Sequence, residues 1–490
     1  MVNQLQAEPT VATLEKGTVG RAERQVTNLI CVWLVIMPWL VGARFWWVQA
    51  LTAVIGLAAL VVAVRSPEGR QTLLRFPVFW IGLLFVGYVA CQALNPWGVA
   101  TQRVPGINVW DVTTRDHVAW LPSGVIAVYA QMGTWRMFTY WLGPWLLVCA
   151  WWAAVRRRRS GHRFALIVFI NGVATAAVVI FEFFHHPAKI LGVYADPGFE
   201  PDIMAGLTSS AGFVNHNAAA AYLYLALAAG LGVACRLQAR AAEEVRDSGV
   251  TWIPLLGCLV IVAGLFAVGS RTGLVLGCAI FLIGFGLMLA WSLFAVNRSP
   301  GLWVGGLILL VAAGGLAAYE FHSGNSGTLE RWRYLNAHPE DQDVRAILRQ
   351  ESLHMMQAHP WLGWGAGTFR YVSPNYFYAD QRFLSSSSIG GLSLWTDFAH
   401  CDWLQFPLEY GAIGGGLVLA MLIYGLGTAL WHIRRLGLPG VMALLGAGAM
   451  LAHSAVDYPM FNAAVFALFA LLVTTTLKTA TLAVRRSGRS

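Results

Sequence analysis

The sequence predicts an all-α polytopic membrane protein with about twelve transmembrane helices. Its 490 residues are 57% hydrophobic and only 12% charged, with a mean hydropathy of +0.59. A water-soluble domain of this composition would have too little polar surface to cover itself. A helix needs about 20 apolar residues to cross a hydrocarbon core about 30 Å thick. The chain offers about twelve such runs: 27–43, 45–64, 76–95, 137–155, 164–184, 213–235, 252–269, 273–296, 302–319, 411–431, 441–456 and 463–482.

The arginines predict the orientation of these spans, since short basic loops stay on the cytoplasmic side. With a cytoplasmic N-terminus, every even-numbered connection falls inside. These connections and the tail hold Arg65, Arg70, Arg75, Arg156 to Arg159, Arg163, Arg236, Arg240, Arg246, Arg298, Arg434, Arg435, Arg485, Arg486 and Arg489. We therefore expect both termini in the cytoplasm. The net charge of +9 follows from this topology and requires no nucleic-acid partner.

The spans divide the chain into five parts. We expect a cytoplasmic tail over 1–26, transmembrane helices 1 to 9 over 27–319, a large outer loop over 320–410, helices 10 to 12 over 411–482, and a second cytoplasmic tail over 483–490. The first tail lacks the apolar segment of a cleavable signal peptide, so the first span is expected to target the chain. Six of the seven cysteines lie in predicted spans, and Cys401 alone lies in an outer loop, so no disulfide framework is expected.

Three outer loops are long, namely 96–136, 185–212 and 320–410, and long loops are often functional. The first is a candidate outer lid. In the last, the segment "DQDVRAILRQESLHMMQAHP" has helical periodicity and is predicted to end at the His359-Pro360 step. The following "GWGAGTF" carries Gly363, Gly365 and Gly367, which permit a tight loop with close backbone approach.

Polar groups at the outer start of two spans predict an anion site. The segment "VGSRTGLVLG" places Arg271 at the start of the eighth span, where free N–H groups and the positive end of the helix dipole favour phosphate. The segment "SAGFVNHNAAAAYLYLAL" places Asn215, His216 and Asn217 at the start of the sixth span. The alternative is that Arg271 only snorkels to lipid headgroups and that the asparagines only cap a helix.

The same outer face is expected to carry Arg333, Arg345, Arg349 and His400. No Lys, Arg, Asp or Glu lies near the midplane of any predicted span, whereas ion-coupled transporters keep ionisable groups at that depth. The pattern therefore disfavours a pump or exchanger. It favours an enzyme that acts on a lipid-linked anion at the outer leaflet.

Four motifs, in this order, resemble those of the O-antigen ligase and O-antigen polymerase superfamily. They are F-x-N-x-N at Phe213, Asn215 and Asn217, S-R-T-G at Ser270 to Gly273, H-P-x-x-G-x-G at His359 to Gly365, and A-H-x-D-x-L followed by E-x-G at Ala399, His400, Asp402, Leu404, Glu409 and Gly411. The late segment "HSAVDYPMFNAA" is similar to a tail segment of some members. The resemblance covers roughly residues 165–475.

The resemblance implies a GT-C-like glycosyltransferase of the bacterial inner membrane, whose active site faces the periplasm. Its donor would be a glycan on a polyprenyl diphosphate, usually undecaprenyl diphosphate. A ligase passes that glycan to a lipid A core sugar, whereas a polymerase of O-antigen, capsule or exopolysaccharide passes it to another lipid-linked repeat. Neither reaction requires a nucleotide, and such ligases are considered metal-independent, so we expect no cofactor. The expected partners are the donor, the acceptor and membrane lipids.

Within this family reaction, Arg271 would stabilise the diphosphate leaving group. Further diphosphate ligands would come from Asn215, His216, Asn217, Arg333, Arg345 and Arg349. His400 would act as the general base on the acceptor hydroxyl, with inversion at the sugar carbon. Asp402 or Glu409 would orient it. The alternatives are a structural histidine and, for the two acids, helix capping or solvation.

The chain departs from the family pattern at two points. Many ligases carry an arginine just before or within the F-x-N segment, where this chain has Ser209, Ser210 and Ala211. Asn commonly follows the histidine, where this chain has Cys401. We interpret Cys401 as a tolerated small residue, with a nucleophilic thiol as the alternative.

Other functions remain open on the sequence. His185 and His186 adjoin at an outer span end, but no third metal ligand lies at a readable spacing, so an interfacial or acceptor-binding role is preferred. A glycan-lipid flippase is expected to have a cationic cavity running inward between two helical repeats, and the sequence shows neither. A noncatalytic scaffold predicts that His400 and Arg271 can be replaced.

Overall fold

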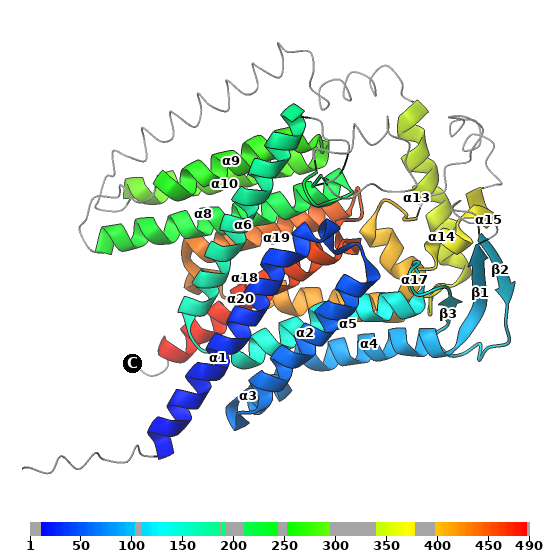
Figure 1. Cartoon of the computed structure of the whole chain (residues 1–490), viewed down its shortest axis with the longest axis horizontal. Helices are drawn as coiled ribbons and strands as arrows, with labels where there is room; N and C mark the ends of the chain where they lie inside the picture. The colour runs from blue at the N-terminus through cyan, green and yellow to red at the C-terminus, as the bar shows by residue number, and fades with distance from the viewer. Residues whose placement is uncertain are drawn as a thin grey trace, which may run out of the picture.

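The computed structural model describes residues 11–102, 110–185, 189, 191–192, 210–243, 252–294, 340–377 and 397–487. The ninth predicted span, 302–319, and Arg333 lie outside these residues. The α-helices are α1 (Val11–Ile36), α2 (Trp46–Val64), α3 (Pro67–Leu74), α4 (Pro77–Leu94), α5 (Thr134–Ala154), α6 (Arg158–His185), α8 (His216–Glu243), α9 (Trp252–Val268), α10 (Arg271–Phe294), α13 (Glu340–Ala358), α14 (Phe369–Val372), α15 (Pro374–Phe377), α17 (Asp402–Leu422), α18 (Thr428–Trp431), α19 (Ile433–Ser454) and α20 (Ala463–Ser487) (Figure 1).

Eight helices in the described part of the chain are long and apolar enough to cross a membrane. They are α2, α4, α6, α8, α10, α17 extended through α18, α19 and α20, and α9 is a shorter apolar helix. The prediction of a helical polytopic membrane protein is confirmed at this level. The count of twelve and the orientation in the membrane stay predictions.

The first predicted span, 27–43, is broken near its end. Helix α1 stops at Ile36, and two short 3₁₀ turns follow, η1 (Met37–Trp39) and η2 (Val41–Ala43). Pro38 cannot continue an α-helix without loss of a hydrogen bond, and Gly42 adopts a φ of +60° inside the second turn. The break turns the chain into α2 and leaves Arg44 at the turn.

Helix α1 begins at Val11, so residues 11–26 of the predicted tail are helical. Glu23 explains why this part is held against the bundle. Its carboxylate is buried and accepts hydrogen bonds from the backbone N–H groups of Arg156 and Arg157, both at 3.1 Å, and from the Ser160 hydroxyl at 2.7 Å. These donors lie at the start of α6, where an acidic group is favourable.

Helix α8 lies at the centre of the bundle and contacts α6, α9, α10, α19 and α20. It is almost completely buried, and its sequence is rich in alanine. Small residues let neighbouring helices approach closely. A Cβ added at Gly172 of α6 would lie 2.2 Å from the Ala226 Cβ, and one at Gly446 of α19 would lie 2.7 Å from the Ala228 Cβ.

The loop 96–136 contains a small sheet that the all-α prediction did not include. Its strands are β1 (Pro96–Gln102), β2 (Trp110–Thr114) and β3 (Gly124–Ile126), in the order β2-β1-β3. β1 and β2 pair antiparallel from Gly98↔Thr114 to Gln102↔Trp110, and β1 and β3 pair parallel. Valine, threonine and tryptophan favour strands. Figure 1 shows the sheet at one end of the bundle, beside α13, α14 and α15.

The large outer loop is partly helical and joins the tenth span without a break at the predicted boundary. Helix α13 ends at Ala358, directly before the His359-Pro360 step, as predicted. Helix α17 begins at Asp402, nine residues before the predicted start of the span, and bends at Gly411, whose φ is +63°. It continues through a π-helical turn, η4 (Ile423–Gly427), into α18. A last 3₁₀ turn, η5 (Pro459–Phe461), connects α19 to α20.

Candidate active site

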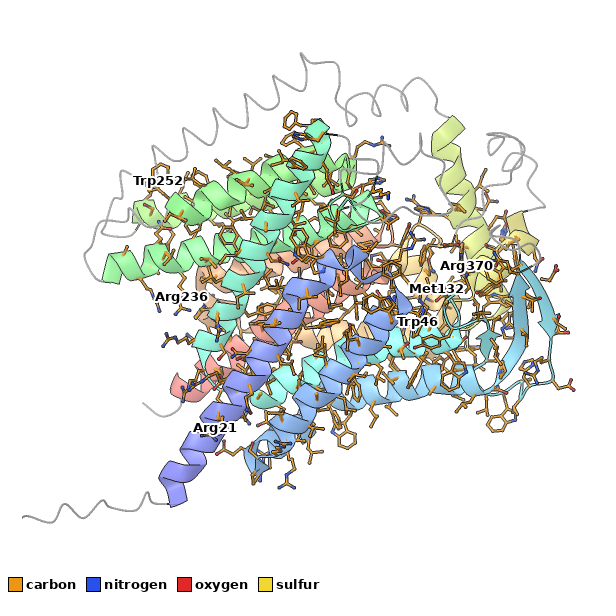
Figure 2. The ribbon with its side chains drawn as sticks, in the orientation of Figure 1. Arg21, Trp46, Met132, Arg236, Trp252 and Arg370 are labelled. Carbon is orange, nitrogen blue, oxygen red and sulfur yellow. The ribbon has the colours of Figure 1, made fainter. Side chains whose placement is uncertain are left out.

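A cavity of about 850 Å³ lies at the end of the bundle next to the sheet. Figure 2 shows three of its lining residues, Trp46, Met132 and Arg370, grouped there. Its walls come from the α1–α2 connection, the start of α5, the start of α8, α14 with residues 397–400, and the α19–α20 connection. The polar lining residues are Arg44, Gln49, Gln131, Arg136, Tyr140, Asn215, His216, Asn217, Arg370, Asp397, His400, Asp457, Tyr458 and Asn462.

His400 and Asp457 form a hydrogen-bonded pair in this cavity. The Nδ1 atom of His400 lies 3.1 Å from Oδ1 of Asp457, whose side chain is only 3% exposed. When Nδ1 carries the ring proton and donates a hydrogen bond to the carboxylate, Nε2 has a lone pair with which it can accept a proton. His400 also has a φ of +50°, a left-handed conformation that costs a residue with a side chain about 1–3 kcal/mol. Such strain is concentrated at functional sites.

The carboxylate that contacts His400 is that of Asp457, whereas the sequence suggested Asp402 or Glu409. Asp402 is buried and supports the connection that carries Asp457. Its backbone N–H donates to the Asp457 carbonyl at 3.1 Å, and its carboxylate accepts the Met460 N–H at 3.1 Å. Asp457 belongs to the segment "HSAVDYPMFNAA", which is part of the family resemblance. That resemblance could therefore have identified Asp457 as a candidate, whereas the residues next to His400 in the sequence could not.

Glu409 is fully buried and holds the glycine loop. Its carboxylate accepts the Gly367 N–H at 2.9 Å and a Gln405 side-chain N–H at 3.0 Å, and its carbonyl accepts the Gly365 N–H at 2.9 Å. Gly363, Gly365 and Gly367 have φ values of +69°, +107° and +70°. The loop leads directly into α14, so Glu409 fixes the position from which α14 presents Arg370 to the cavity.

Three arginines that the sequence analysis did not single out line the cavity: Arg44, Arg136 and Arg370. Arg370 is buried, and its Nη2 atom lies 2.7 Å from Oδ1 of Asp397. Arg136 donates to Oε1 of Gln49 at 3.2 Å and to the carbonyls of Ala130 and Arg44. These three acceptors are neutral, so they do not neutralise its guanidinium charge.

A sequence signal for two of these arginines existed. Arg44 and Arg136 lie at the predicted outer ends of spans, where the positive-inside rule does not place basic residues. An arginine on that side needs a reason other than topology. The sequence indicates Arg370 less clearly, only by its position three residues after the third loop glycine, Gly367.

The predicted residues at the start of α8 lie in the cavity wall. Asn215 caps the helix, because its Oδ1 accepts the Asn217 N–H at 2.7 Å, and its Nδ2 donates to the Tyr458 hydroxyl at 2.8 Å. His216 and Asn217 also line the cavity. The structure therefore brings Asn215, His216, Asn217 and His400 together.

Arg271 follows Ser270, which contacts the cavity residue Asn217. Arg271 itself is not among the described residues that line the cavity. It begins α10 and is half-buried. The preceding Ser270 donates its hydroxyl to Oδ1 of Asn217 at 2.6 Å and accepts the Gly273 N–H at 3.2 Å. These bonds join the starts of α8 and α10.

The remaining predicted residues lie away from the cavity or have no described side chain. Arg349 is on α13, close enough to Cys401 for its charge to act on the thiol. Arg345 is also on α13, but its side chain is not described. Burial raises the pKa of the Cys401 thiol above its usual value, so the thiol stays protonated at neutral pH.

The predicted histidine pair at the end of α6 is described in part. The Nδ1 atom of His185 lies 2.9 Å from the Phe181 carbonyl, and its ring stacks on that of Phe181. His186 lies outside the described residues. Within those residues, no three His, Cys, Asp or Glu side chains are gathered as metal ligands.

Residues 256–419 match a family model described as O-antigen ligase. No curated protein is similar enough to the chain to count as a match. The matched region contains Arg271, the glycine loop, Arg370 and His400, while Arg44, Arg136 and Asp457 lie outside it. Three of the four motifs lie within the matched residues, and the resemblance to the superfamily is confirmed. The match at residues 256–419 supports the O-antigen ligase and polymerase superfamily for this part of the chain.

Proposed function

We propose that the protein transfers a glycan from a polyprenyl diphosphate carrier to a sugar hydroxyl, at the periplasmic face of the bacterial inner membrane. The observation that carries this proposal is one cavity that contains both the His400–Asp457 pair and three arginines. A base and a set of cations are the two functions that this reaction needs from the protein. The family match supports the reaction class.

The leaving group accounts for the arginines. Breaking the bond between the sugar carbon and the diphosphate oxygen places negative charge on the diphosphate, and fixed guanidinium groups stabilise that charge. Arg44, Arg136 and Arg370 line the cavity from three different segments. The start of α8 adds the positive end of a helix dipole. Arg271, on the neighbouring helix start, is proposed as a further contributor to the same charge.

The acceptor accounts for the histidine pair. The acceptor hydroxyl gives its proton to Nε2 of His400 while its oxygen attacks the sugar carbon from the side opposite the diphosphate, so the configuration inverts. The imidazolium formed is stabilised by Asp457, which accepts the Nδ1–H bond. A positioned general base typically contributes about 10²–10⁴-fold to the rate.

Metal independence follows from the same proposal, because the guanidinium groups supply positive charge in a planar, bidentate form that suits phosphate oxygens. The acceptor determines the product. A ligase acts on a lipid A core sugar, and a polysaccharide polymerase acts on a second lipid-linked glycan. Both would use the same base and the same cations, because these groups act on the donor bond and on a hydroxyl.

The experiment that tests the proposal is transfer by the purified protein in nanodiscs. The donor is an undecaprenyl-diphosphate glycan, supplied with and without lipid A core. Product on the core supports a ligase, and longer lipid-linked chains in the absence of core support a polymerase. Movement of the donor across the bilayer of liposomes that contain the protein, with neither product formed, would contradict the proposal and point to a flippase.

A further inference from the structure

A second cavity, of about 350 Å³, lies between α6, α8, α19 and α20 at the other end of the bundle. Helix α8 connects the two cavities. Asn217 lines the first and Arg236 lines the second. At 1.5 Å per residue, the helix is about 28 Å long between Asn217 and Arg236, close to the hydrocarbon thickness of about 30 Å, and about 15 Å long between the nearest lining residues, Ala218 and Ala228. Figure 2 shows Arg236 far from Trp46, Met132 and Arg370. In the predicted topology, the polar ends of the two cavities therefore lie toward opposite membrane surfaces.

The second cavity is strongly basic. Its ionisable lining residues are Arg159, His162, Arg163, Arg236 and Arg240, and no Asp or Glu lines it in the described part of the chain. Arg159 and Arg240 lie close enough to Arg236 for their positive charges to act on it. Like charges this close repel one another unless an anion lies among them.

Two buried polar atoms in this cavity also need a partner. Nη1 of Arg236 and Oγ1 of Thr475 are buried, and neither has a hydrogen-bond partner among the described residues. Both residues line the cavity. A buried donor without an acceptor costs about 1–3 kcal/mol, and more when it is charged. A phosphate oxygen would accept from both groups.

The remaining wall is mostly apolar, with Thr476 and Thr479 as its polar residues. Phe164, Ala228, Ala443 and Leu472 line it, together with Leu166, whose side chain is 42% exposed on α6. An exposed leucine on a spanning helix faces lipid, so the cavity reaches the lipid-facing surface of the bundle. A ligand that fills it needs an anionic head for the arginines and a hydrocarbon chain for the apolar wall.

We propose that this cavity binds an anionic phospholipid of the cytoplasmic leaflet. Its phosphate lies among Arg236, Arg240 and Arg159, and an acyl chain lies along α6 beside Leu166. Basic pockets between transmembrane helices on the cytoplasmic side suit such headgroups. The site is separate from glycan transfer, because the buried central part of α8 lies between the two cavities.

The test is lipid binding to the full-length protein in detergent, measured by native mass spectrometry and by the lipid-induced rise in Tm. The added ligands are cardiolipin, phosphatidylcholine and inorganic phosphate. The variant is Arg236→Gln/Arg240→Gln. The matched control is Arg434→Gln/Arg435→Gln, which removes the same charge from the same end of the bundle, since both residues lie within two positions of the lining residue Leu436.

We expect cardiolipin, but not phosphatidylcholine, to bind the unmodified protein and raise its Tm. The Arg236→Gln/Arg240→Gln variant should lose about fivefold in affinity for each arginine removed, and the control should keep the full affinity. Equal losses in the two double variants would overturn the proposal, because they would indicate general surface attraction. The proposal would also be overturned if phosphatidylcholine bound as tightly as cardiolipin, or if inorganic phosphate raised the Tm as much as cardiolipin does. Arg240→Gln alone, at an exposed position, provides the same comparison if the double variant does not fold.

Discussion

The two cavities are both lined by arginines, but they are assembled differently. The larger cavity takes Arg44, Arg136 and Arg370 from segments far apart in the sequence, and it also contains carboxylates and His400. The smaller cavity takes its four arginines as two pairs, each pair one helical turn apart on α6 or α8, and no carboxylate lines it in the described residues.

This difference separates two reasons for keeping an arginine. Basic residues near the cytoplasmic ends of spans set the orientation of a membrane protein, and in the predicted topology the four arginines of the smaller cavity satisfy that rule as well as lining a cavity. Topology gives no reason for Arg44 or Arg136 at predicted outer ends. Their position is explained by the chemistry proposed for the larger cavity.

The largest effect is expected from the histidine pair. His400→Ala removes the proposed base and should lower kcat for glycan transfer by about 10²–10⁴-fold. Asp457→Asn should lower kcat in the same direction, because Nδ1 loses a charged acceptor. The control is His432→Ala, since His432 lies outside both cavities. Rates for His400→Ala and His432→Ala that agree within about twofold would show that the pair is structural.

The next largest effect compares arginines at the two ends of the bundle. Arg136→Gln removes one cation from the larger cavity and should lower kcat by about 10²–10³-fold, the usual cost of losing one group that stabilises leaving-group or oxyanion charge. Because the groups that accept hydrogen bonds from Arg136 are neutral, the substitution does not leave a carboxylate without its partner. Arg434→Gln, at the other end, should transfer at the unmodified rate. If both variants lose the same activity, the distinction between the two sets of arginines is wrong.

A smaller effect, on stability, is expected at the glycine loop. A Cβ at Gly365 would lie 2.4 Å from the Gly124 Cα, and its φ of +107° is unfavourable for alanine. Gly365→Ala should therefore lower the free energy of unfolding by more than about 1 kcal/mol, seen as a lower Tm in detergent. Gly416→Ala, at an open position on α17, is the control and should not lower Tm. Equal Tm values for the two variants would mean that the loop does not need glycine at 365.

The smallest effect is expected at Cys401. Because burial raises the pKa of its thiol, the thiolate fraction at neutral pH is low, and alkylation by iodoacetamide should be slow and should accelerate as the pH rises. Cys401→Ser should transfer glycan at close to the unmodified rate. A loss of 10²-fold or more in Cys401→Ser would instead favour a nucleophilic thiol.

The sequence predicted the elements whose signal is local. Apolar runs located the spanning helices of the described part of the chain to within about nine residues at either end, and the His359-Pro360 step marked the end of α13. The sheet was not predicted, because its strands are short and pair between segments that the sequence does not relate. The start of α17 was placed too late, because Asp402, Gln405 and Glu409 interrupt the apolar pattern in its first turns.

The site could be predicted only in part, for the same reason. His400 and the residues at the start of α8 belong to motifs, so the sequence identified them. Asp457 reaches His400 across 57 positions, a pairing that no spacing near the histidine indicates. Arg44 and Arg136 come to the cavity through the break after α1 and the start of α5, and only the tertiary fold brings these segments together.

The central claim is that His400 acts as a base held by Asp457, and chemical rescue tests it most directly. Single-turnover transfer by His400→Ala in nanodiscs should be slowed by about 10²–10⁴-fold and should be partly restored by added imidazole, in proportion to the neutral form of imidazole. The same additions should leave the unmodified protein unchanged. Transfer by His400→Ala at the unmodified rate, without imidazole, would contradict the account.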